Sequence, residues 1–416
     1  MRTVSPYGYG VADDHASSPN PPVLLTEPHG GVPAVVEDAS ELDRVLESLT
    51  AGSGPVAIDA ERASGFRYLP RAYLIQLRRN GSGTIMIDPT RFDDLTGVNE
   101  RLADTEWILH AASQDLPCLA EVGMRPPRLF DTELAARLCG MERVGLASLT
   151  ERLLGYSLEK HHSAADWSTR PLPHDWLKYA ALDVELLIEL RERLAEELRE
   201  QGKQEWAAEE FEALANSSPP PPRKDPWRRT SGIHRVRGAR ALARVRELWY
   251  ARDELARSMD KAPSKIVPDL AISDAAIADP SNVGKLLTIP GFQRRHGRAN
   301  TERWLDALER VRHMRATELP PVSAHSDGPP ATHRWASRDP EAAARLKLAR
   351  QAVADLAEEH RLPAENLLAP AAVRSLAWQP PDPANETAVR ESLRNAGARN
   401  WQIELTAAAL AEALAD

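Results

Sequence analysis

Apolar positions in the N-terminal half change their spacing along the chain, and each spacing predicts a secondary-structure element. Between Glu37 and Leu49, leucines and a valine recur three and four residues apart, which is the spacing of one buried helical face. Val56, Ala57 and Ile58 form a continuous apolar run that ends on Asp59, as in a strand buried on both faces. Further strands are predicted at residues 72–78, 83–88 and 106–110, with a hairpin turn at 80–83. The pattern therefore predicts a mixed sheet with helices packed on it.

From about residue 110 to about residue 215 the periodicity is helical, and two later breaks in composition mark linkers. Four consecutive prolines at 219–222 favour extended chain, and a second stretch rich in proline and glycine follows Glu318. The first residues are rich in Pro, Gly, Ser and Asp, a composition typical of disorder. The sequence predicts a disordered N-terminus at 1–26, an α/β domain at 27–215, a linker at 216–231, a helical domain at 232–316, a linker at 317–334 and a second helical domain at 335–416.

The two helical units resemble each other in the order of their parts. Each begins with a long predicted helix, at 240–256 and at 345–359, and a proline-flanked segment follows it. Each ends on another helix, predicted at 301–311 and at 401–414. The period of roughly 80 residues is too long for a solenoid. The pattern indicates a degenerate duplication of one small domain.

The composition is that of an ordinary soluble protein, with 42% hydrophobic and 27% charged residues among 416. No apolar run approaches the roughly 18 residues that cross a bilayer, and the first residues lack the apolar core of a signal peptide. Cys118 and Cys139 lie among apolar residues, which suits a reducing compartment better than a disulfide. We therefore expect a cytoplasmic protein without a membrane partner. The sequence leaves the oligomeric state open, with a monomer as the expectation.

The net charge of −9 argues against a protein that coats nucleic acid indiscriminately. One segment departs from this balance, because residues 223–252 hold ten Lys or Arg and only two acids. Such a local excess is typical of a surface that follows a phosphate backbone, and its candidate contacts are Arg235, Arg237, Arg240 and Arg244. The alternative is a solvated helix face that touches no nucleic acid. The second helical unit lacks this excess.

Two carboxylates stand together at the end of the Val56–Ile58 strand. Asp59 and Glu61 are two residues apart, so in extended chain their side chains point to the same side. Two carboxylates held this close repel each other, and without a cation at least one of them takes up a proton. An acidic strand end in solvent would show the same two residues. The pair alone therefore leaves both a surface and a metal site open.

Three further stretches add to this pair. Asp115 falls just past a predicted strand, in the first turn of a helix, where the helix dipole favours an anion. Tyr179 and Asp183 are four residues apart in a predicted helix and therefore share one face. Asp131 begins another helix and is interpreted as an N-cap rather than as a ligand. The candidate set is therefore four acids and one tyrosine.

The order of these residues resembles the DEDDy 3′-5′ exonucleases and, among them, the ribonuclease D family. The motifs that carry the resemblance are Asp59-x-Glu61, His110-x4-Asp115 and Tyr179-x3-Asp183, and flanking segments match at 68–77, 130–132, 145–160 and 166–172. The resemblance covers about residues 30–215, and the two helical units resemble the HRDC domain. It implies an α/β fold class, with a ribonuclease H-like mixed-sheet exonuclease domain followed by two small all-α, HRDC-like domains.

The resemblance implies phosphodiester hydrolysis, and the residue types suit that chemistry. Two hard cations about 3.5–4 Å apart can stabilise the attacking and the leaving oxygen of such a reaction. Mg²⁺ and Mn²⁺, the expected ions, prefer carboxylate ligands. Asp59 is expected to bridge both cations, Glu61 and Asp183 to complete the first site, and Asp115 to support the second. Tyr179 is expected to orient the attacking water rather than to act as a strong base.

The sequence departs from the family pattern at two positions. Ala60 stands where a hydroxyl residue is more usual, and Arg62 stands where an aromatic residue is common. Neither change removes a ligand, and Arg62 is interpreted either as a phosphate contact or as a solvated arginine. The other candidate nucleic-acid contacts are Arg71, His110, Lys160, Trp167 and Arg170, each with an ordinary structural role as the alternative. His161 and His162 are interpreted as exposed histidines and not as metal ligands.

The leading interpretation is a metal-dependent 3′-5′ exoribonuclease that trims RNA ends. Precursors of transfer RNA are the substrate that the resemblance implies. The same chemistry on DNA is a close alternative, because the four acids do not read the sugar. A catalytically idle RNA-binding scaffold is an alternative from another class, and the intact set of acids argues against it.

Overall fold

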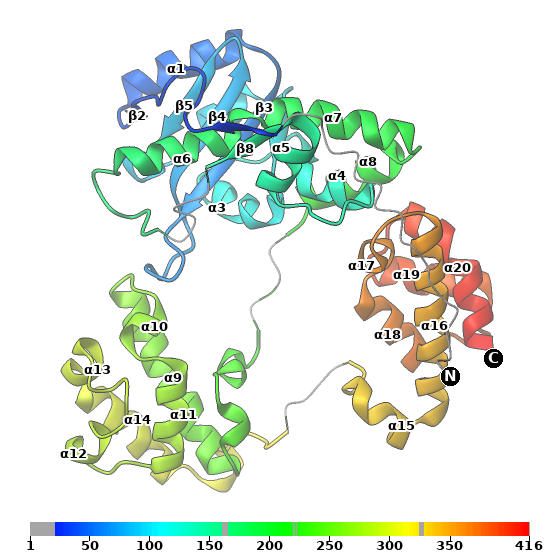
Figure 1. The fold of residues 1–416 in the computed structure, drawn as a ribbon. Helices are drawn as coiled ribbons and strands as arrows, with labels where there is room; N and C mark the ends of the chain where they lie inside the picture. Colours follow the sequence, from blue (N-terminus) through cyan, green and yellow to red (C-terminus); the bar gives the residue numbers. More distant parts are fainter. Residues whose placement is uncertain (1–20, 160–164, 219–220, 222, 324–327, 416) are drawn as a thin grey trace, which may run out of the picture.

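The computed structural model describes residues 21–159, 165–218, 221, 223–323 and 328–415, which form three units. Figure 1 shows the N-terminal unit with its sheet and two helical units beneath it. The first helical unit lies beneath one side of the sheet-containing unit, and the second lies beneath the other side. The order of the units along the chain is the order that the sequence predicts.

The N-terminal unit is built on a six-stranded sheet with the order β2-β5-β4-β3-β6-β7. These strands are β2 (Val35–Val36), β3 (Ser53–Arg62), β4 (Ala72–Asn80), β5 (Gly83–Ile87), β6 (Glu106–Leu109) and β7 (Arg128–Asp131). β3, β4 and β5 run antiparallel as a meander, and the pairs β2–β5, β3–β6 and β6–β7 are parallel. The predicted mixed sheet is confirmed, and β3 lies inside it with a neighbour on each side.

The two faces of β3 carry different kinds of side chain. Ile58 and Ala60 are buried in the main apolar core of the unit. Asp59 and Glu61 alternate with them and therefore point to the opposite face. Helix α6 (His174–Glu185) packs against β3, β4 and β5. Its Ala180 and Ala181 share a small core with Leu74 of β4, on the face that carries the acids.

The other helices of the unit are α1 (Ala39–Ala51), α2 (Thr96–Arg101), α3 (Leu116–Glu121), α4 (Thr132–Leu138), α5 (Leu146–Leu154), α7 (Leu187–Glu200) and α8 (Gln204–Ala215), with 3₁₀ turns η1 (Pro89–Arg91) and η2 (Ala112–Gln114). Asp38 is the N-cap of α1, because its carboxylate accepts a hydrogen bond from the Glu41 amide.

Two expectations about the N-terminal unit need correction. The expected disorder of residues 1–26 does not include β1 (Val23–Leu25), which pairs in parallel with β8 (Tyr156–Leu158); residues 1–20 lie outside the described range. The segment after residue 110 is not purely helical either, because β7 extends the sheet beside β6. Strands of three or four residues are too short to show a period of two, and they form here because a neighbouring strand completes their hydrogen bonds.

The first helical unit contains α9 (Ala239–Ser258), α10 (Pro263–Ile266), α11 (Asp269–Ala278), α12 (Val283–Leu286), α13 (Arg295–Ala299) and α14 (Thr301–His313), with 3₁₀ turns η3 (Pro226–Arg229), η4 (Ile233–Arg235) and η5 (Ala316–Glu318). Its core includes Trp227, which is fully buried beside residues of α9. The linker expected at 216–231 therefore ends before η3, because this tryptophan anchors the segment to the unit. The predicted long helix and last helix are confirmed.

The second helical unit contains α15 (Trp335–Arg338), α16 (Pro340–Glu359), α17 (Ala364–Leu367), α18 (Pro370–Trp378), α19 (Glu386–Asn395) and α20 (Asn400–Ala415), preceded by η6 (Thr332–Arg334). Its apolar core is continuous with the core of the sheet-containing unit. Trp401 of α20 stacks on Trp206 of α8, with ring centroids 4.9 Å apart and planes 13° apart. Lys203 donates to the carbonyl oxygens of both Leu138 and Arg361, one in each unit.

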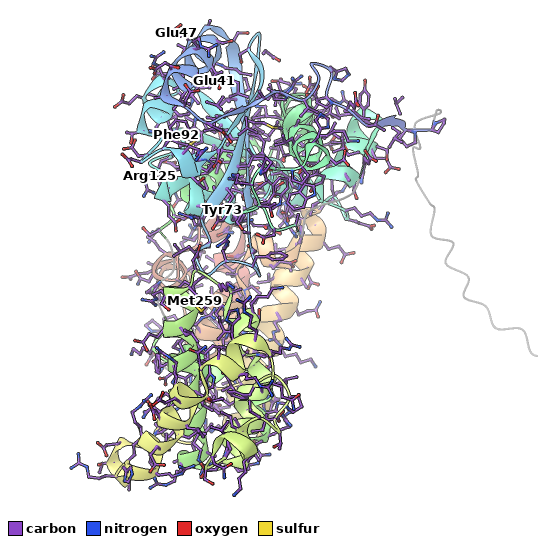
Figure 2. All side chains as sticks on the ribbon, turned by 90° about the vertical axis from the view of Figure 1, so that its left-hand side faces the viewer. Glu41, Glu47, Tyr73, Phe92, Arg125 and Met259 are labelled. Atoms are coloured by element: carbon purple, nitrogen blue, oxygen red, sulfur yellow. The ribbon has the colours of Figure 1, made fainter. Side chains whose placement is uncertain are left out.

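The first helical unit meets the sheet-containing unit at the loop between β3 and β4. Tyr68 in this loop donates its hydroxyl to Asp253 of α9 at 3.0 Å. The amides of Tyr68 and Leu69 both donate to Asp260, at 3.2 Å each. Figure 2 shows Met259, which caps α9, at the end of the helical unit that faces this loop. The loop follows directly on the acidic end of β3, so the contact lies next to the acids in sequence.

None of the helices in the described parts of the chain has the length and apolar composition needed to span a bilayer.

Candidate active site

Three carboxylates from two elements meet at the end of β3. Asp59 and Glu61 come from the strand and Asp183 comes from α6, and one oxygen of each lies within 4.8 Å of the others. The alternation of β3 turns the first two toward α6, and the last turns of α6 bring the third. The sequence predicts these three as ligands of one cation, and the structure brings them together.

Burial makes this cluster unfavourable without a cation. Desolvation raises the pKa of Asp59 from 3.8 to about 6. Desolvation, together with the charges of Asp59, Asp183 and Asp115, raises the pKa of Glu61 well above its ordinary value. The pKa of Asp183 rises for the same two reasons, burial first and the Asp59 charge second. A divalent cation would remove this cost, because it favours the ionised form of every carboxylate around it.

Gln76 lies beside Asp59 across the β3–β4 ladder, where the two residues are direct partners. Its side chain is fully buried, and in the described structure neither amide atom has a hydrogen-bond partner. A buried amide needs polar partners, so this position is built for a polar or ionic environment. The oxygen-rich donor set and the buried amide together fit a hard cation such as Mg²⁺ or Mn²⁺.

Tyr179 lies one helical turn before Asp183 on α6, as its spacing predicted, and its hydroxyl is hydrogen-bonded to the Asp183 carboxylate. Burial and the charge of Asp183 raise the pKa of the tyrosine well above its ordinary value, so the phenol stays protonated. The Trp167 ring lies next to the Tyr179 ring, with ring centroids 6.5 Å apart. Trp167 is fully buried, so it has the ordinary structural role that was the alternative to a nucleic-acid contact.

Asp115 is the fourth acid and has a different environment. It is buried between η2 and α3, and burial together with the Asp59 charge raises its pKa. The loop that carries it is held by Asp131, whose carboxylate accepts hydrogen bonds from the amides of Ala111 and Ala112. Asp131 also caps α4 by accepting from Glu133 and Leu134, which confirms its interpretation as an N-cap. Asp115 lies outside the three-carboxylate group and pairs instead with Arg62, at 3.3 Å.

Several predicted nucleic-acid contacts have structural partners of their own. Arg170 binds Asp88 with two nitrogens, at 2.7 and 2.9 Å, and donates to the Tyr73 carbonyl oxygen, so it is not free for a phosphate. His110 contacts the Thr132 hydroxyl at 2.9 Å, and burial lowers its pKa to about 4, so it stays neutral. Arg71 is exposed over the ring of Tyr73 and remains a candidate. Lys160, His161 and His162 lie outside the described residues.

A buried ion network behind the site was missed by sequence reasoning. Glu185 is fully buried two residues after Asp183, and its carboxylate contacts Arg78 of β4 at 3.3 Å and the His29 ring at 2.7 Å. Arg78 is two residues from Gln76 and therefore lies on the same face of the sheet. This network fixes the end of α6 against β4. The signal available in the sequence was an arginine directly after the apolar positions of β4.

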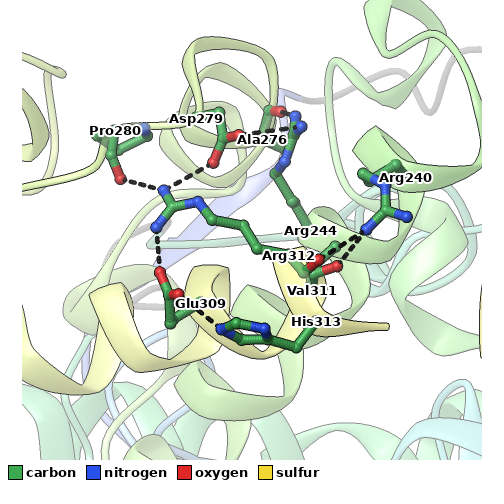
Figure 3. Close-up of polar contacts among 9 residues, drawn as sticks. All are labelled: Arg240, Arg244, Ala276, Asp279, Pro280, Glu309, Val311, Arg312 and His313. Atoms are coloured by element: carbon green, nitrogen blue, oxygen red, sulfur yellow. Dashed lines mark hydrogen bonds and ion pairs between the residues drawn. The ribbon is translucent and has the colours of Figure 1, made fainter. Parts of the chain in front are cut away.

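The predicted basic surface at 223–252 is mostly used inside the first helical unit. Arg240 donates to the carbonyl oxygen of Val311 at 2.6 Å, and Arg244 donates to that of Ala276 at 2.6 Å and pairs with Asp279 (Figure 3). Arg235 pairs with Asp274 at 2.8 Å, and Arg237 donates to the His234 carbonyl oxygen. Figure 3 shows Arg240 at the end of α14 and Arg244 at the end of α11. The interpretation as a phosphate-tracking stripe is therefore corrected for Arg240 and Arg244, which satisfy helix C-terminal carbonyls.

A different group of cations in this unit has no acidic partner among the described residues. It consists of Lys261, Lys265, Arg294, Arg295 and Arg298, on and around α10 and α13. We call this group the α10–α13 cations. Lys265 lies over the ring of Phe66, at 4.7 Å from its centroid, so the group begins at the β3–β4 loop. Lys265, Arg294, Arg295 and Arg298 are exposed and Lys261 is half-buried, so this group is more available to a phosphate backbone than Arg240 and Arg244, whose guanidinium groups are bound to carbonyl oxygens.

Comparison with known proteins places this geometry in a family. Residues 33–199 match a family described as "3'-5' exonuclease", residues 241–308 match the HRDC domain, and residues 328–414 match a family described as "3' to 5' exonuclease C-terminal domain". Ribonuclease D from Zymomonas mobilis is 34% identical over 274 residues, which is 64% of this chain and 69% of that protein.

Solved structures agree with this assignment. A protein from Bifidobacterium adolescentis is 39% identical with a TM-score of 0.87, and the match covers 95% of this chain and 100% of the other. Escherichia coli RNase D, described as an exoribonuclease involved in structured RNA processing, is 25% identical with a TM-score of 0.67, over 92% and 98% of the two chains. The chain belongs to the ribonuclease D family of 3′-5′ exoribonucleases.

Proposed function

We propose that this exoribonuclease hydrolyses RNA from the 3′ end with two divalent cations, Mg²⁺ or Mn²⁺, held by Asp59, Glu61, Asp115 and Asp183. The observation that carries the proposal is the convergence of three half-buried carboxylates within 4.8 Å of one another. Cations at such a site stabilise the attacking and the leaving oxygen of a phosphodiester. Asp59 is central in the proposal, because it is close enough to raise the pKa of each of the other three acids.

The protein's own side chains then supply position and hydrogen bonds. Tyr179 keeps its proton and can therefore donate a hydrogen bond next to Asp183, which suits the orientation of a water molecule and not its deprotonation. The buried amide of Gln76 offers a further polar group beside Asp59. Asp131 holds the loop that presents Asp115.

We propose the 3′ ends of structured RNAs, such as precursors of transfer RNA, as the substrate. The description of the E. coli relative as an enzyme of structured RNA processing supports this choice. The α10–α13 cations lie in the unit that touches the β3–β4 loop, and they could follow a strand that leaves the acidic cluster. DNA remains the alternative substrate, because the four acids do not distinguish the sugar.

The test is hydrolysis of a 5′-labelled single-stranded RNA by the full chain, beside DNA of equal sequence at one salt concentration. We expect a ladder shortened from the 3′ end with Mg²⁺ or Mn²⁺ and no cleavage in EDTA. Asp59→Asn removes the carboxylate common to the whole site, and we expect it to lower the rate by several orders of magnitude. Asp93→Asn, at an exposed position away from the site, is the matched control and should retain full activity.

Two results would contradict the proposal. Hydrolysis by Asp59→Asn in the presence of EDTA would exclude the metal mechanism. Tight RNA binding without any hydrolysis by the unmodified chain, at any Mg²⁺ or Mn²⁺ concentration, would favour the RNA-binding scaffold instead.

A further inference from the structure

Arg62 lies at the last position of β3, directly after the ligand Glu61. One guanidinium nitrogen is 3.3 Å from Oδ1 of Asp115, and another donates to the Gln114 carbonyl oxygen. The Asp115 side chain is only 6% exposed and the Arg62 side chain 25% exposed. The ion pair therefore involves a buried carboxylate and is partly shielded from solvent, and this shielding strengthens the electrostatic attraction between the two groups.

The pairing divides the four acids into two groups. Asp59, Glu61 and Asp183 gather within 4.8 Å and form no ion pair with any described residue. Asp115 lies outside that group and has the guanidinium as its partner. The division of the acids therefore follows from the contact between Arg62 and Asp115.

A guanidinium on Asp115 opposes a metal ion there in two ways. It occupies the carboxylate oxygen that a cation would need, and its positive charge repels a second positive ion at close range. The Arg62 charge also reaches Asp59 and Glu61, whose pKa values it lowers, but its ion pair is with Asp115, and three carboxylates together offset the repulsion of a cation at Asp59, Glu61 and Asp183. The two halves of the site should therefore differ in their affinity for a divalent cation before RNA arrives.

We propose that Arg62 is a built-in counter-ion for Asp115 that makes metal loading sequential. The free protein binds one divalent cation at Asp59, Glu61 and Asp183, and the position at Asp115 accepts a cation only after Arg62 has left it. A phosphate of RNA is the anion that draws Arg62 away, since a guanidinium binds carboxylate and phosphate oxygens with the same two-nitrogen geometry. The inference rests on the proposed function, because it presumes that the four acids hold metal.

The experiment counts Mn²⁺ bound to the full chain in the absence of RNA, from the electron paramagnetic resonance signal of the free ion. We expect one tight site in the unmodified chain and two in Arg62→Gln, which removes the charge but keeps a polar side chain. The weaker site should tighten on the order of 10-fold or more when the nearby positive charge is removed. Arg62→Lys keeps a cation at the position and should behave like the unmodified chain.

The double variant Arg62→Gln, Asp115→Asn assigns the gained site. It should bind one Mn²⁺ again, because Asp115→Asn replaces the carboxylate that Arg62→Gln makes available to a cation. Equal numbers and affinities of sites in the unmodified chain and in Arg62→Gln would overturn the inference. Failure of the proposed function looks different, since Mn²⁺ binding by the unmodified chain would then be unaffected by Asp59→Asn.

Discussion

The two helical units share an order of helices but attach to the exonuclease domain in different ways. The first touches it through the β3–β4 loop, where Tyr68 and Leu69 form hydrogen bonds with Asp253 and Asp260. The second shares a continuous apolar core with it and adds the stacked pair Trp206 and Trp401. Apolar burial is the larger contribution to stability, and a few half-exposed hydrogen bonds are a smaller one.

The difference indicates separate tasks for two similar folds. The second unit is part of the exonuclease domain's own packing, because the carbonyl oxygen of Arg361 lies so close to Gly140 that a Cβ atom there would be 2.2 Å away. The first unit has its own closed core and carries the unpaired α10–α13 cations. We therefore infer that the second unit stabilises the catalytic domain and that the first contacts RNA beside it.

The largest expected effect on stability comes from removing the apolar contact between the second helical unit and the exonuclease domain. Trp401→Ala removes a ring that is 3% exposed and stacked on the exonuclease domain, and we expect a loss of about 3–5 kcal/mol of unfolding free energy. Hydrogen exchange of the β3 amides should accelerate together with that of α20. The matched control is Trp304→Ala, in the core of the first unit, which should accelerate exchange in α14 and leave β3 protected. Equal effects of both variants on β3 would remove the distinction between the units.

A smaller effect on stability is expected from removing a hydrogen bond between the β3–β4 loop and the first helical unit. Tyr68→Phe keeps the ring but loses the hydroxyl contacts with Asp253 and Arg257, on the order of 1 kcal/mol at a partly exposed contact. The first unit should then sample more positions, which small-angle X-ray scattering would record as a larger radius of gyration. The β3 amides should keep their protection. Global unfolding at lower denaturant would mean that this loop is part of the folding core instead.

The smallest change is expected in the salt dependence of RNA binding, measured in an Asp59→Asn background to prevent cleavage. Replacing Arg294, Arg295 and Arg298 by Gln should flatten the slope of log K against log salt by about 2, at roughly 0.7 for each phosphate contact on a single strand. Arg240→Gln should leave the slope unchanged and lower the stability of its unit, because Arg240 is bound to carbonyl oxygens. A flatter slope in Arg240→Gln, together with an unchanged slope in the triple variant, would instead assign the RNA contact to the basic surface at 223–252.

The acidic site was predictable because its parts obey local rules. Alternation along β3 puts Asp59 and Glu61 on one side, and one helical turn joins Tyr179 to Asp183. The arginines of α9 were misjudged because a count of charges does not reveal their partners. Arg244 meets Ala276 only after α9 and α11 have packed together. The same holds for Trp227, whose burial depends on a core assembled from residues far along the chain.

The central claim is that Asp59, Glu61 and Asp183 hold a divalent cation that offsets their burial. Desolvation raises the folded-state pKa of Asp59 from 3.8 to about 6. The free energy of unfolding of the metal-free protein therefore falls as the pH rises from about 4 to about 6, and it stays lower at higher pH. Glu61→Gln removes one repelling charge. Above pH 6 we therefore expect Glu61→Gln to melt at a higher temperature than the unmodified chain in EDTA.

The most direct measurement is thermal unfolding of both proteins at pH 7.5, in EDTA and then in Mn²⁺. The unmodified chain should gain several degrees with Mn²⁺, and Glu61→Gln should gain little, so that the order of their melting temperatures reverses. Glu106→Gln is the control, since it removes a half-buried glutamate paired with Arg191 away from the site and should keep the full gain with Mn²⁺. An equal Mn²⁺ gain in Glu61→Gln, or a lower melting temperature for it in EDTA, would contradict the claim.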